Sequence, residues 1–291
     1  MKSFRIVVLF SAMMIITTAF GKSRKCRLTE RIGVCTSIDN AALIKSAGGA
    51  HVEENLMNFL MPQKSDADFA ANRKAAAESV LPVRSTNCFF PGEIRLTGPD
   101  FDIEMAVAYT EVAMRRAAEV GIKVTVLGSG WARSYPEGFS RDEAERQFVT
   151  LLKRMGAIAK KYGVVIAIEP LRKQECNFIN TVQEGYEIAK KVGSPNVKVN
   201  ADIYHMMQEG ESPQSLINAG RKYIANVHIA ENARRTPPGT DGDDFTPYFR
   251  ALKKIKYNGS ISIECGWGDF AKQLKPAIQE VQRQLLIAYG E

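Results

Sequence analysis

The sequence contains few histidines and no closely paired cysteines. Three of its 291 residues are histidine, and its five cysteines include no Cys-x-x-Cys pair. An odd number of scattered cysteines argues against a disulfide framework and against a zinc knuckle. We therefore expect the cysteines to be small buried or strand-end residues, with room for at most one disulfide.

The chain also lacks an excess of positive charge beyond its first residues. Its formal net charge is +7, but six lysines and arginines precede Glu30, the first acidic residue. The rest of the chain then has 33 basic and 32 acidic residues. Because binding to a phosphate backbone needs clustered positive charge, we do not expect nucleic acid as a partner.

No apolar run reaches the length of a membrane span. The apolar run at residues 6–20 has 15 residues, whereas a transmembrane helix needs about 20. Two basic residues before this run and the small residues of Ala19-Phe20-Gly21 after it are typical of a secretory signal peptide. The sequence thus predicts a signal peptide at about 1–21, an N-terminal tail at 22–29, and an exported protein, periplasmic or secreted, without stable membrane insertion after cleavage. An anchoring or buried N-terminal helix is the alternative.

Eight short apolar segments alternate with segments of helical pattern after residue 30. The apolar segments are 30–36, 50–55, 83–90, 122–130, 163–170, 196–202, 223–230 and 260–265. Nearly continuous apolar strands separated by helices are typical of a parallel sheet covered by helices. No domain-sized linker or low-complexity segment interrupts this pattern. The sequence therefore predicts a single-domain (β/α)8 TIM barrel, of class α/β, over residues 30–291.

Several of the expected helices have recognisable start signals. Ser140 with Glu143, and Thr181 with Glu184, have the spacing of capping boxes. Pro99, followed by an aspartate, is expected to begin a long helix. These signals set the helix boundaries that the structure can test.

Four of the later apolar segments end in residues of types that bind metal ions. These residues are Glu169, Asp202, His228 and Glu264. They are 33, 26 and 36 residues apart, each about one strand-plus-helix unit. One acidic residue after a strand is usually a helix cap or a solvated charge, but four such side chains would converge at the carboxyl-terminal end of the barrel.

Three carboxylates and one imidazole, without a thiolate, favour a hard or borderline divalent ion. We expect one divalent metal ion, Mn2+ in the first place, with Mg2+, Co2+ or Zn2+ as alternatives. Glu169 and Glu264 would flank a bound substrate, taking a proton from carbon on one face and returning it on the other. The metal would polarise the adjacent carbonyl and stabilise the enediolate.

The segments IEPLRKQECNF, ADIYHM, HIAENARRTPPG and IEC resemble the xylose isomerase-like TIM-barrel superfamily, in particular its sugar phosphate isomerase/epimerase group, which includes the ketose 3-epimerases. The resemblance covers about residues 121–266. It implies metal ligands at Glu169, Asp202, His228 and Glu264. It also implies that Glu169 and Glu264 are the catalytic acid/base pair.

Further residues match the substrate contacts of that group. The resemblance implies substrate binding by Glu175, His205 and Arg234. Arg172-Lys173 stands where the epimerases usually have Asn-Arg, so we expect a different pattern of recognised hydroxyls. Glu53, after the second apolar segment, is expected to be a charge on the rim of the barrel, with substrate contact as the alternative.

The resemblance implies a metal-dependent isomerase or epimerase of a sugar or keto-sugar. Export favours a neutral monosaccharide or keto-glycoside over a phosphorylated sugar. A metal-dependent sugar dehydratase (lyase) on the same site and a non-catalytic sugar-binding barrel are alternatives. A phosphodiesterase of the endonuclease IV type is not expected, because its multi-zinc site is richer in histidine. Whether the protein forms a homo-oligomer is left open.

Overall fold

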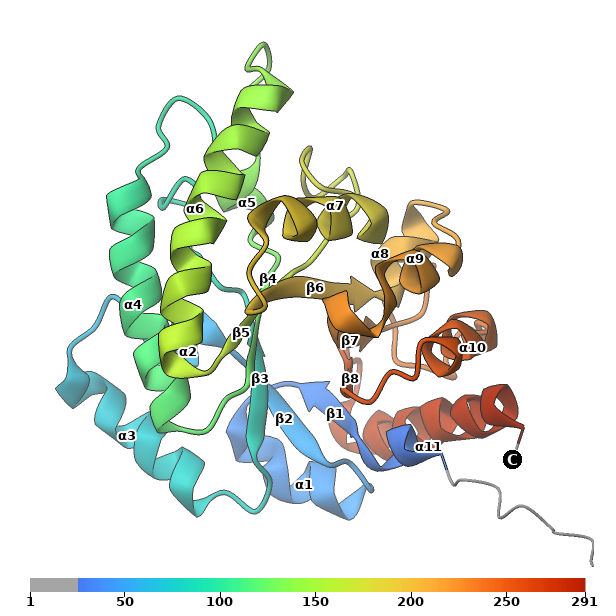
Figure 1. Cartoon of the computed structure of the whole chain (residues 1–291). Helices are drawn as coiled ribbons and strands as arrows, with labels where there is room; N and C mark the ends of the chain where they lie inside the picture. The colour runs from blue at the N-terminus through green and yellow to red at the C-terminus, as the bar shows by residue number, and fades with distance from the viewer. Residues whose placement is uncertain (1–25, 291) are drawn as a thin grey trace, which may run out of the picture.

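Eight parallel strands close into one barrel in the computed structural model, which describes residues 26–290 (Figure 1). The strands are β1 (Ile32–Cys35), β2 (His51–Asn55), β3 (Val83–Asn87), β4 (Val124–Leu127), β5 (Val165–Ile168), β6 (Val197–Asp202), β7 (Ile224–Ile229) and β8 (Ser260–Ile263). Each strand pairs in parallel with its neighbours along the chain, and β8 closes the barrel against β1. The predicted TIM barrel is confirmed, whereas the predicted signal peptide at 1–21 lies outside the described residues.

Helices surround the barrel (Figure 1). The helices of nine or more residues are α3 (Asp66–Glu78), α4 (Ile103–Glu119), α6 (Arg141–Tyr162), α7 (Val182–Val192), α9 (Gln214–Tyr223), α10 (Thr246–Lys254) and α11 (Phe270–Tyr289). The shorter ones are η1 (Arg27–Glu30), η2 (Ile38–Asn40), α1 (Ala41–Ser46), α2 (Leu56–Phe59), α5 (Gly130–Arg133) and α8 (Ile203–Gln208). Among residues 26–290, none of these helices combines the length and apolarity needed to cross a bilayer.

The side chains along several strands alternate between the barrel interior and the layer beneath the helices. In β8, the Ser262 hydroxyl donates to Glu53 inside the barrel, whereas Ile261 and Ile263 are fully buried in the apolar core. In β7, His228 bonds to the same Glu53 inside the barrel. We expected strands that are apolar along nearly their whole length. Instead, the face of these strands that points into the barrel is polar.

The helix starts agree in part with the capping signals. Thr181 and Glu184 form the predicted reciprocal capping box. Ser140 accepts the N–H of Glu143 at 3.3 Å, but the Glu143 carboxylate pairs with Arg146 instead of the cap. Helix α4 begins at Ile103, later than predicted from Pro99, because the Asp102 carboxylate caps the helix by accepting two backbone N–H groups.

The described part of the predicted N-terminal tail packs against the barrel. The 3-10 helix η1 contacts α11, and Leu28 is buried. The amide of Gln282 also donates to the carbonyl of Thr29 at 3.2 Å.

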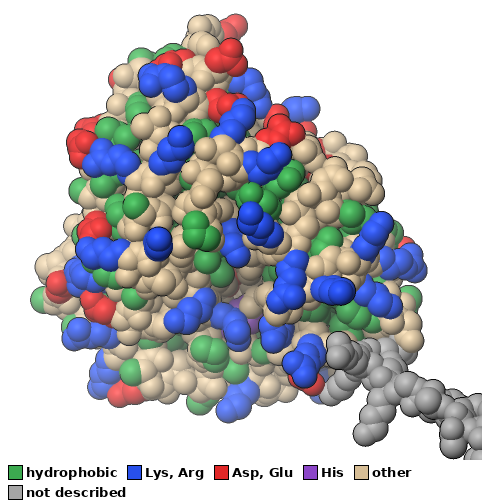
Figure 2. Space-filling view, in the orientation of Figure 1, with side chains coloured by type: hydrophobic (Ala, Val, Ile, Leu, Met, Phe, Trp, Pro, Cys, Tyr) green, Lys and Arg blue, Asp and Glu red, His purple; other side chains and the backbone are tan. Residues whose placement is uncertain are grey.

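On the face shown in Figure 2, Lys and Arg side chains surround a central hollow in which a histidine is visible.

Candidate metal centre and active site

The carboxyl-terminal ends of β5 to β8 bring together the four residues predicted as metal ligands. Glu169 and Glu264 directly follow β5 and β8, Asp202 ends β6, and His228 lies in β7. One ligand-type atom of each lies within 4.8 Å of those of the other three. Glu169, Asp202 and His228 are 5%, 2% and 0% exposed. The parallel strands thus place three carboxylates and one imidazole at a single, largely buried point.

The imidazole of His228 lies between the two glutamates of this cluster. Its Nδ1 is 2.9 Å from Glu169 Oε1 and 3.1 Å from Glu264 Oε2. The amide nitrogen of Asn200 donates to Glu169 Oε1 at 2.7 Å. Asp202 accepts the backbone N–H of Tyr204 with Oδ1 at 2.9 Å, which caps α8. Each side chain of the cluster is therefore held by a hydrogen bond or close pairing with a neighbour.

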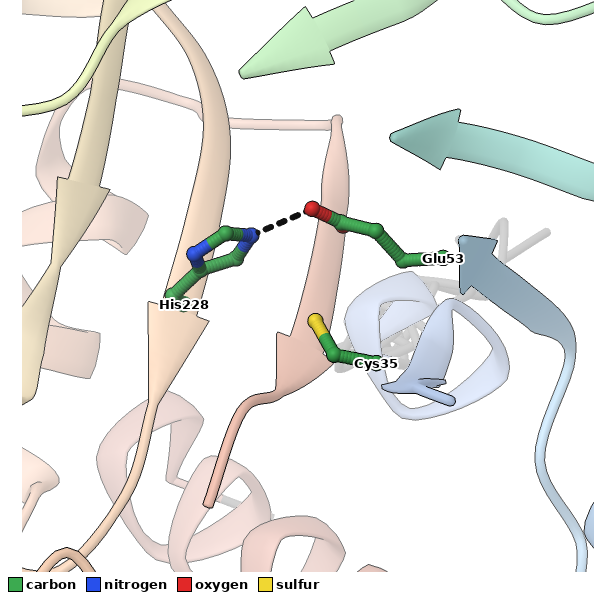
Figure 3. A group of neighbouring side chains, drawn as sticks. All are labelled: Cys35, Glu53 and His228. Atoms are coloured by element: carbon green, nitrogen blue, oxygen red, sulfur yellow. Dashed lines mark hydrogen bonds and ion pairs between the residues drawn. The ribbon is translucent and has the colours of Figure 1, made fainter. Parts of the chain in front are cut away.

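Glu53 supports the other side of the same imidazole (Figure 3). Its Oε1 lies 2.7 Å from His228 Nε2, and its Oε2 accepts from Ser85 at 2.6 Å and Ser262 at 2.8 Å. Glu53 is 1% exposed, so the expectation of a rim charge was wrong. A carboxylate bonded to the far nitrogen fixes the ring of a metal-ligating histidine and increases its basicity. The alternation in HVEEN, with Val52 outside and Glu53 inside, is the signal that identifies it.

Cys35, Glu53 and His228 form a second group of metal-ligand types within 4.8 Å (Figure 3). Burial, and then the Glu53 carboxylate, raise the pKa of the Cys35 thiol well above its usual value. A protonated thiol is a poor metal ligand. Since His228 Nε2 is also bonded to Glu53, this group is better described as the support of the first cluster than as a second metal centre.

Burial and mutual repulsion shift the titration of the cluster. Burial raises the pKa of Glu169 and of Asp202. Burial alone would raise the pKa of Glu264 too, but His228 and Arg235 outweigh it and lower that pKa. Burial lowers the pKa of His228, but the nearby carboxylates outweigh burial and raise it well above its usual value.

The charge of this region fits a bound cation. Four buried or partly buried carboxylates, including Glu53, lie beside the imidazoles of His228 and His205 and the guanidinium of Arg235. Buried carboxylates are costly unless opposite charge compensates them. The oxygen-rich donor set, with one imidazole nitrogen, suits a divalent ion such as Mn2+, Mg2+, Co2+ or Zn2+. The residues that would hold it are the four of the cluster.

A cavity of about 320 Å3 adjoins the cluster and is lined by Glu169, Glu175, His205, Arg235 and Glu264, among others. His205 is 1% exposed, and its Nε2 has no hydrogen-bond partner among residues 26–290. Gly128 also lines the cavity, and a Cβ there would lie 2.4 Å from Glu169 Oε2. A side chain at position 128 would therefore displace the Glu169 carboxylate from its position in the cluster.

The structure places Arg235, not Arg234, at the cluster. The Arg235 guanidinium donates to Glu264 Oε2 at 2.7 Å and to Asp202 Oδ2 at 3.2 Å. The side chain of Arg234 is 68% exposed and pairs with Asp241. Arg235 has a φ of +53°, a left-handed conformation that is uncommon outside glycine and turns the chain at this point. The sequence contains no signal that distinguishes the two adjacent arginines.

The unusual Arg172-Lys173 pair does not line the cavity, but Arg172 contacts Glu175, which does. Arg172 Nε donates to Glu175 Oε1 at 2.7 Å, and its guanidinium stacks over Tyr204. Lys173 pairs with Glu209 at 3.2 Å and is otherwise exposed. The departure from Asn-Arg therefore places one additional cation beside Glu175, a predicted substrate contact.

Comparison with known proteins agrees with this geometry. Residues 41–286 match the family model described as a xylose isomerase-like TIM barrel. The chain belongs to this family. Within the xylose isomerase-like family, D-psicose 3-epimerase of Ruminiclostridium cellulolyticum is 30% identical over 175 residues, 59% of each chain. The 3-dehydro-D-guloside 4-epimerase of Escherichia coli is 28% identical over 160 residues, 53% of this chain and 61% of the relative. The chain thus spans about three fifths of the length of these two relatives.

Solved xylose isomerase-like barrels share the fold over most of their length. The apo form of 3-keto-D-glucoside 4-epimerase from Escherichia coli has a TM-score of 0.73 at 23% identity, covering 87% of this chain and 98% of that one. D-allulose 3-epimerase from Methylomonas sp., in complex with D-allulose, has a TM-score of 0.72 at 24% identity, covering 87% and 96%. At these identities the likeness shows the fold alone.

Proposed function

We propose that this protein is a divalent-metal-dependent isomerase or epimerase that moves a proton on the carbon next to the carbonyl of a sugar or keto-sugar. The observation that carries the proposal is the convergence of Glu169, Asp202, His228 and Glu264 beside one cavity. Relatives of the chain are named D-psicose 3-epimerase, 3-dehydro-D-guloside 4-epimerase and inosose isomerase, which supports the same class of reaction.

The metal site of the proposal consists of Glu169, Asp202, His228 and Glu264, with Glu53 orienting the imidazole. We take Mn2+ as the expected ion, with Mg2+, Co2+ and Zn2+ as alternatives. A divalent ion held there would polarise the substrate carbonyl and stabilise the negative charge that develops on its oxygen. Because Nε2 of His228 is bonded to Glu53, Nδ1 is the imidazole nitrogen that would bind the metal.

In the proposed reaction, Glu169 and Glu264 are the acid/base pair. One of them, as a carboxylate, takes the proton from the carbon next to the carbonyl. The electron pair of the broken C–H bond forms the C=C bond of an enediolate, and the carbonyl electrons move to oxygen. For an epimerisation, the other glutamate returns a proton to the opposite face of the same carbon. Asn87 and Asn200 hold the two carboxylates in place, donating to Glu264 at 2.6 Å and to Glu169 at 2.7 Å.

Polar side chains around the cavity would bind the substrate hydroxyls. His205 offers a buried Nε2 with no hydrogen-bond partner among the described residues, 3.5 Å from Asp202 Oδ2, and Glu175 offers a carboxylate that is one third exposed. Arg235 lies closer to the cluster than Arg234, so we assign it the role first expected of Arg234. A guanidinium so placed suits a hydroxyl or a developing oxyanion.

The proposal includes export, on the basis of residues 1–21, which lie outside the described part of the chain. An exported enzyme would meet neutral sugars rather than phosphorylated ones. We therefore propose a neutral keto-sugar or keto-glycoside as the substrate class. The state of assembly, monomer or homo-oligomer, does not enter this proposal.

Turnover in D2O tests the reaction. The purified protein, dialysed against EDTA and reloaded with Mn2+, is incubated with a panel of keto-sugars in D2O, and the products are analysed by NMR and mass spectrometry. We expect one deuterium at the carbon next to the carbonyl, and loss of activity without the metal. A product lighter by one water would instead identify a dehydratase. Turnover without deuterium at carbon would contradict proton transfer through this pair.

A further inference from the structure

A second cavity adjoins the candidate active site. It has a volume of about 550 Å3 and is lined by residues at the ends of β1, β2, β3 and β8 and by residues of α2 and α3. Glu264, Asn87 and Cys88 line both cavities. The two spaces therefore meet at one of the two glutamates of the proposed acid/base pair. A ligand whose reacting carbon lies beside Glu264 could extend from the first cavity into the second.

The lining of the second cavity is polar and carries no positive charge. The carboxylates and carboxamides that line it are Asp39, Glu53, Glu54, Asn55, Asn58, Asn72, Asn87 and Glu264. Among the described residues that form its wall there is no lysine or arginine. A phosphate or carboxylate group would meet like charge there without a compensating cation. Hydroxyl groups, which both donate to carboxylates and bond to amides, match this lining well.

The main carboxylate of this wall has a fixed position. Glu54 is 7% exposed, its Oε1 accepts the backbone N–H of Ile38 at 2.5 Å, and its Oε2 accepts that of Asn55 at 3.2 Å. Each carboxylate oxygen can accept more than one hydrogen bond, so both retain capacity for a ligand hydroxyl. Asn72 is similarly anchored, because its amide nitrogen donates to the carbonyls of Asn58 and Phe59. Anchored polar groups bind a ligand with little further ordering.

We propose that the second cavity is a subsite for the non-reacting sugar unit of a neutral glycoside, whose keto-sugar unit reacts beside Glu264. The inference rests on the proposed function and specifies its substrate class. The first cavity alone, at about 320 Å3, is at the lower end of the range of about 300–1,000 Å3 for small-molecule sites. The two cavities together reach the upper part of that range, which suits a ligand of two sugar units.

Blocking the second cavity tests this subsite. Ala75, on α3, lines it, so Ala75→Trp places a large side chain inside. Ala77→Trp, on the exposed surface of the same helix, is the matched control. The substrates are methyl 3-keto-glucoside and the 3-keto derivative of maltose, with kcat/KM measured for each. We expect the disaccharide to be preferred at least about tenfold by the unmodified chain and the Ala77→Trp control, and Ala75→Trp to remove that preference.

A binding measurement separates failure of the subsite from failure of the proposed reaction. Calorimetry with the unreactive parents, maltose and methyl glucoside, is performed on the Mn2+-loaded protein and both variants. Tighter binding of maltose that is lost only in Ala75→Trp supports the subsite even if no keto-sugar is turned over. Equal binding of both sugars, or an equal effect of the two tryptophan variants, overturns it. Asn58→Ala, a smaller change in the same wall, is expected to lower the affinity for maltose about fivefold.

Discussion

The interior of the barrel and the layer outside it are built from the same strands but from opposite chemistry. Inside, polar side chains such as Glu53, Asn200 and Ser262 bond to one another and to the candidate metal ligands. Outside, the alternate residues of the strands, such as Ile261, pack against the helices in an apolar core. Buried polar groups gain little net stability, because their hydrogen bonds mainly offset the loss of water. We therefore expect the outer layer to determine stability and the interior to determine activity.

The largest expected effect is the loss of activity on substituting an interior carboxylate. Glu264→Gln removes both a proposed acid/base group and a metal ligand, so we expect kcat/KM to fall by about a thousandfold or more. The measurement is the rate of deuterium incorporation into substrate in D2O. The thermal unfolding midpoint is expected to remain close to that of the unmodified protein, since the apolar layer is untouched.

Glu93→Gln is the matched control for this substitution. Glu93 is an exposed glutamate outside the cluster, so the same chemical change is expected to leave both activity and stability unchanged. If Glu264→Gln retained full activity, Glu264 would have no part in the mechanism, and the division between the two regions would lose its functional side.

Substituting an apolar residue of the outer layer is expected to lower stability and leave activity unchanged. Ile261 is fully buried, so Ile261→Ala should lower the free energy of unfolding by about 3 kcal/mol. Denaturant unfolding measures this loss, and kcat of the folded fraction should equal that of the unmodified protein. Ile287→Ala, at a position that is 47% exposed, should cost clearly less. A large loss of kcat in Ile261→Ala without a loss of stability would show that the two regions are not separable in this way.

Substituting the carboxylate behind the histidine sharpens the functional side of the comparison. Glu53→Gln keeps the size of the side chain but removes the negative charge beside His228 Nε2. Loss of such a supporting partner typically weakens metal binding about 10- to 100-fold, and we expect this for Mn2+ titrated by calorimetry. Ser85→Ala, which removes one hydrogen bond to Glu53, should weaken it less. Unchanged Mn2+ affinity in Glu53→Gln would exclude an orienting role.

The same two regions explain what could be predicted from the sequence. The spacing of Glu169, Asp202, His228 and Glu264 follows from the length of one strand-plus-helix unit, so their convergence could be predicted once a closed barrel was assumed. The polar support beneath them was harder to foresee. Asn200 and similar residues are single polar positions within apolar strands, and only the inward or outward direction of each side chain, fixed by register, gives them a role.

The loops could be predicted least. Whether Arg234 or Arg235 faces the cluster depends on a left-handed backbone conformation at one residue, and neither composition nor periodicity encodes it. The bond between Glu53 and His228 joins residues 175 positions apart in sequence. Such contacts depend on tertiary packing rather than on local pattern. The sequence therefore identified the residues that the strand rhythm places, and missed those that loop conformation and register place.

The smallest expected effect concerns His51, a histidine inside the barrel that is not part of the cluster. His51 is fully buried, its Nε2 lies 3.0 Å from Ser262 Oγ, and a Cβ at Gly33 would lie 2.3 Å from its ring, so only glycine leaves room for it. Burial lowers the pKa of His51 to about 4. The unfolded chain binds this proton near pH 6.5, about the usual value, whereas the folded chain does not until near its lowered pKa.

Acidification from pH 6.5 to pH 5.5 therefore favours the unfolded state at this site, because only the unfolded chain gains the proton. One proton changes the free energy of unfolding by at most about 1.4 kcal/mol per pH unit, and we expect this free energy to fall by about 1 kcal/mol over the interval. Denaturant unfolding at both pH values, performed on the unmodified protein and on His51→Gln, isolates the contribution of His51 to the pH dependence of stability. The carboxylates of the cluster titrate in both proteins, so their contribution cancels in the difference. Parallel stability curves for the two proteins would mean that His51 is protonated inside the barrel, and that the interior tolerates charge away from the metal ligands.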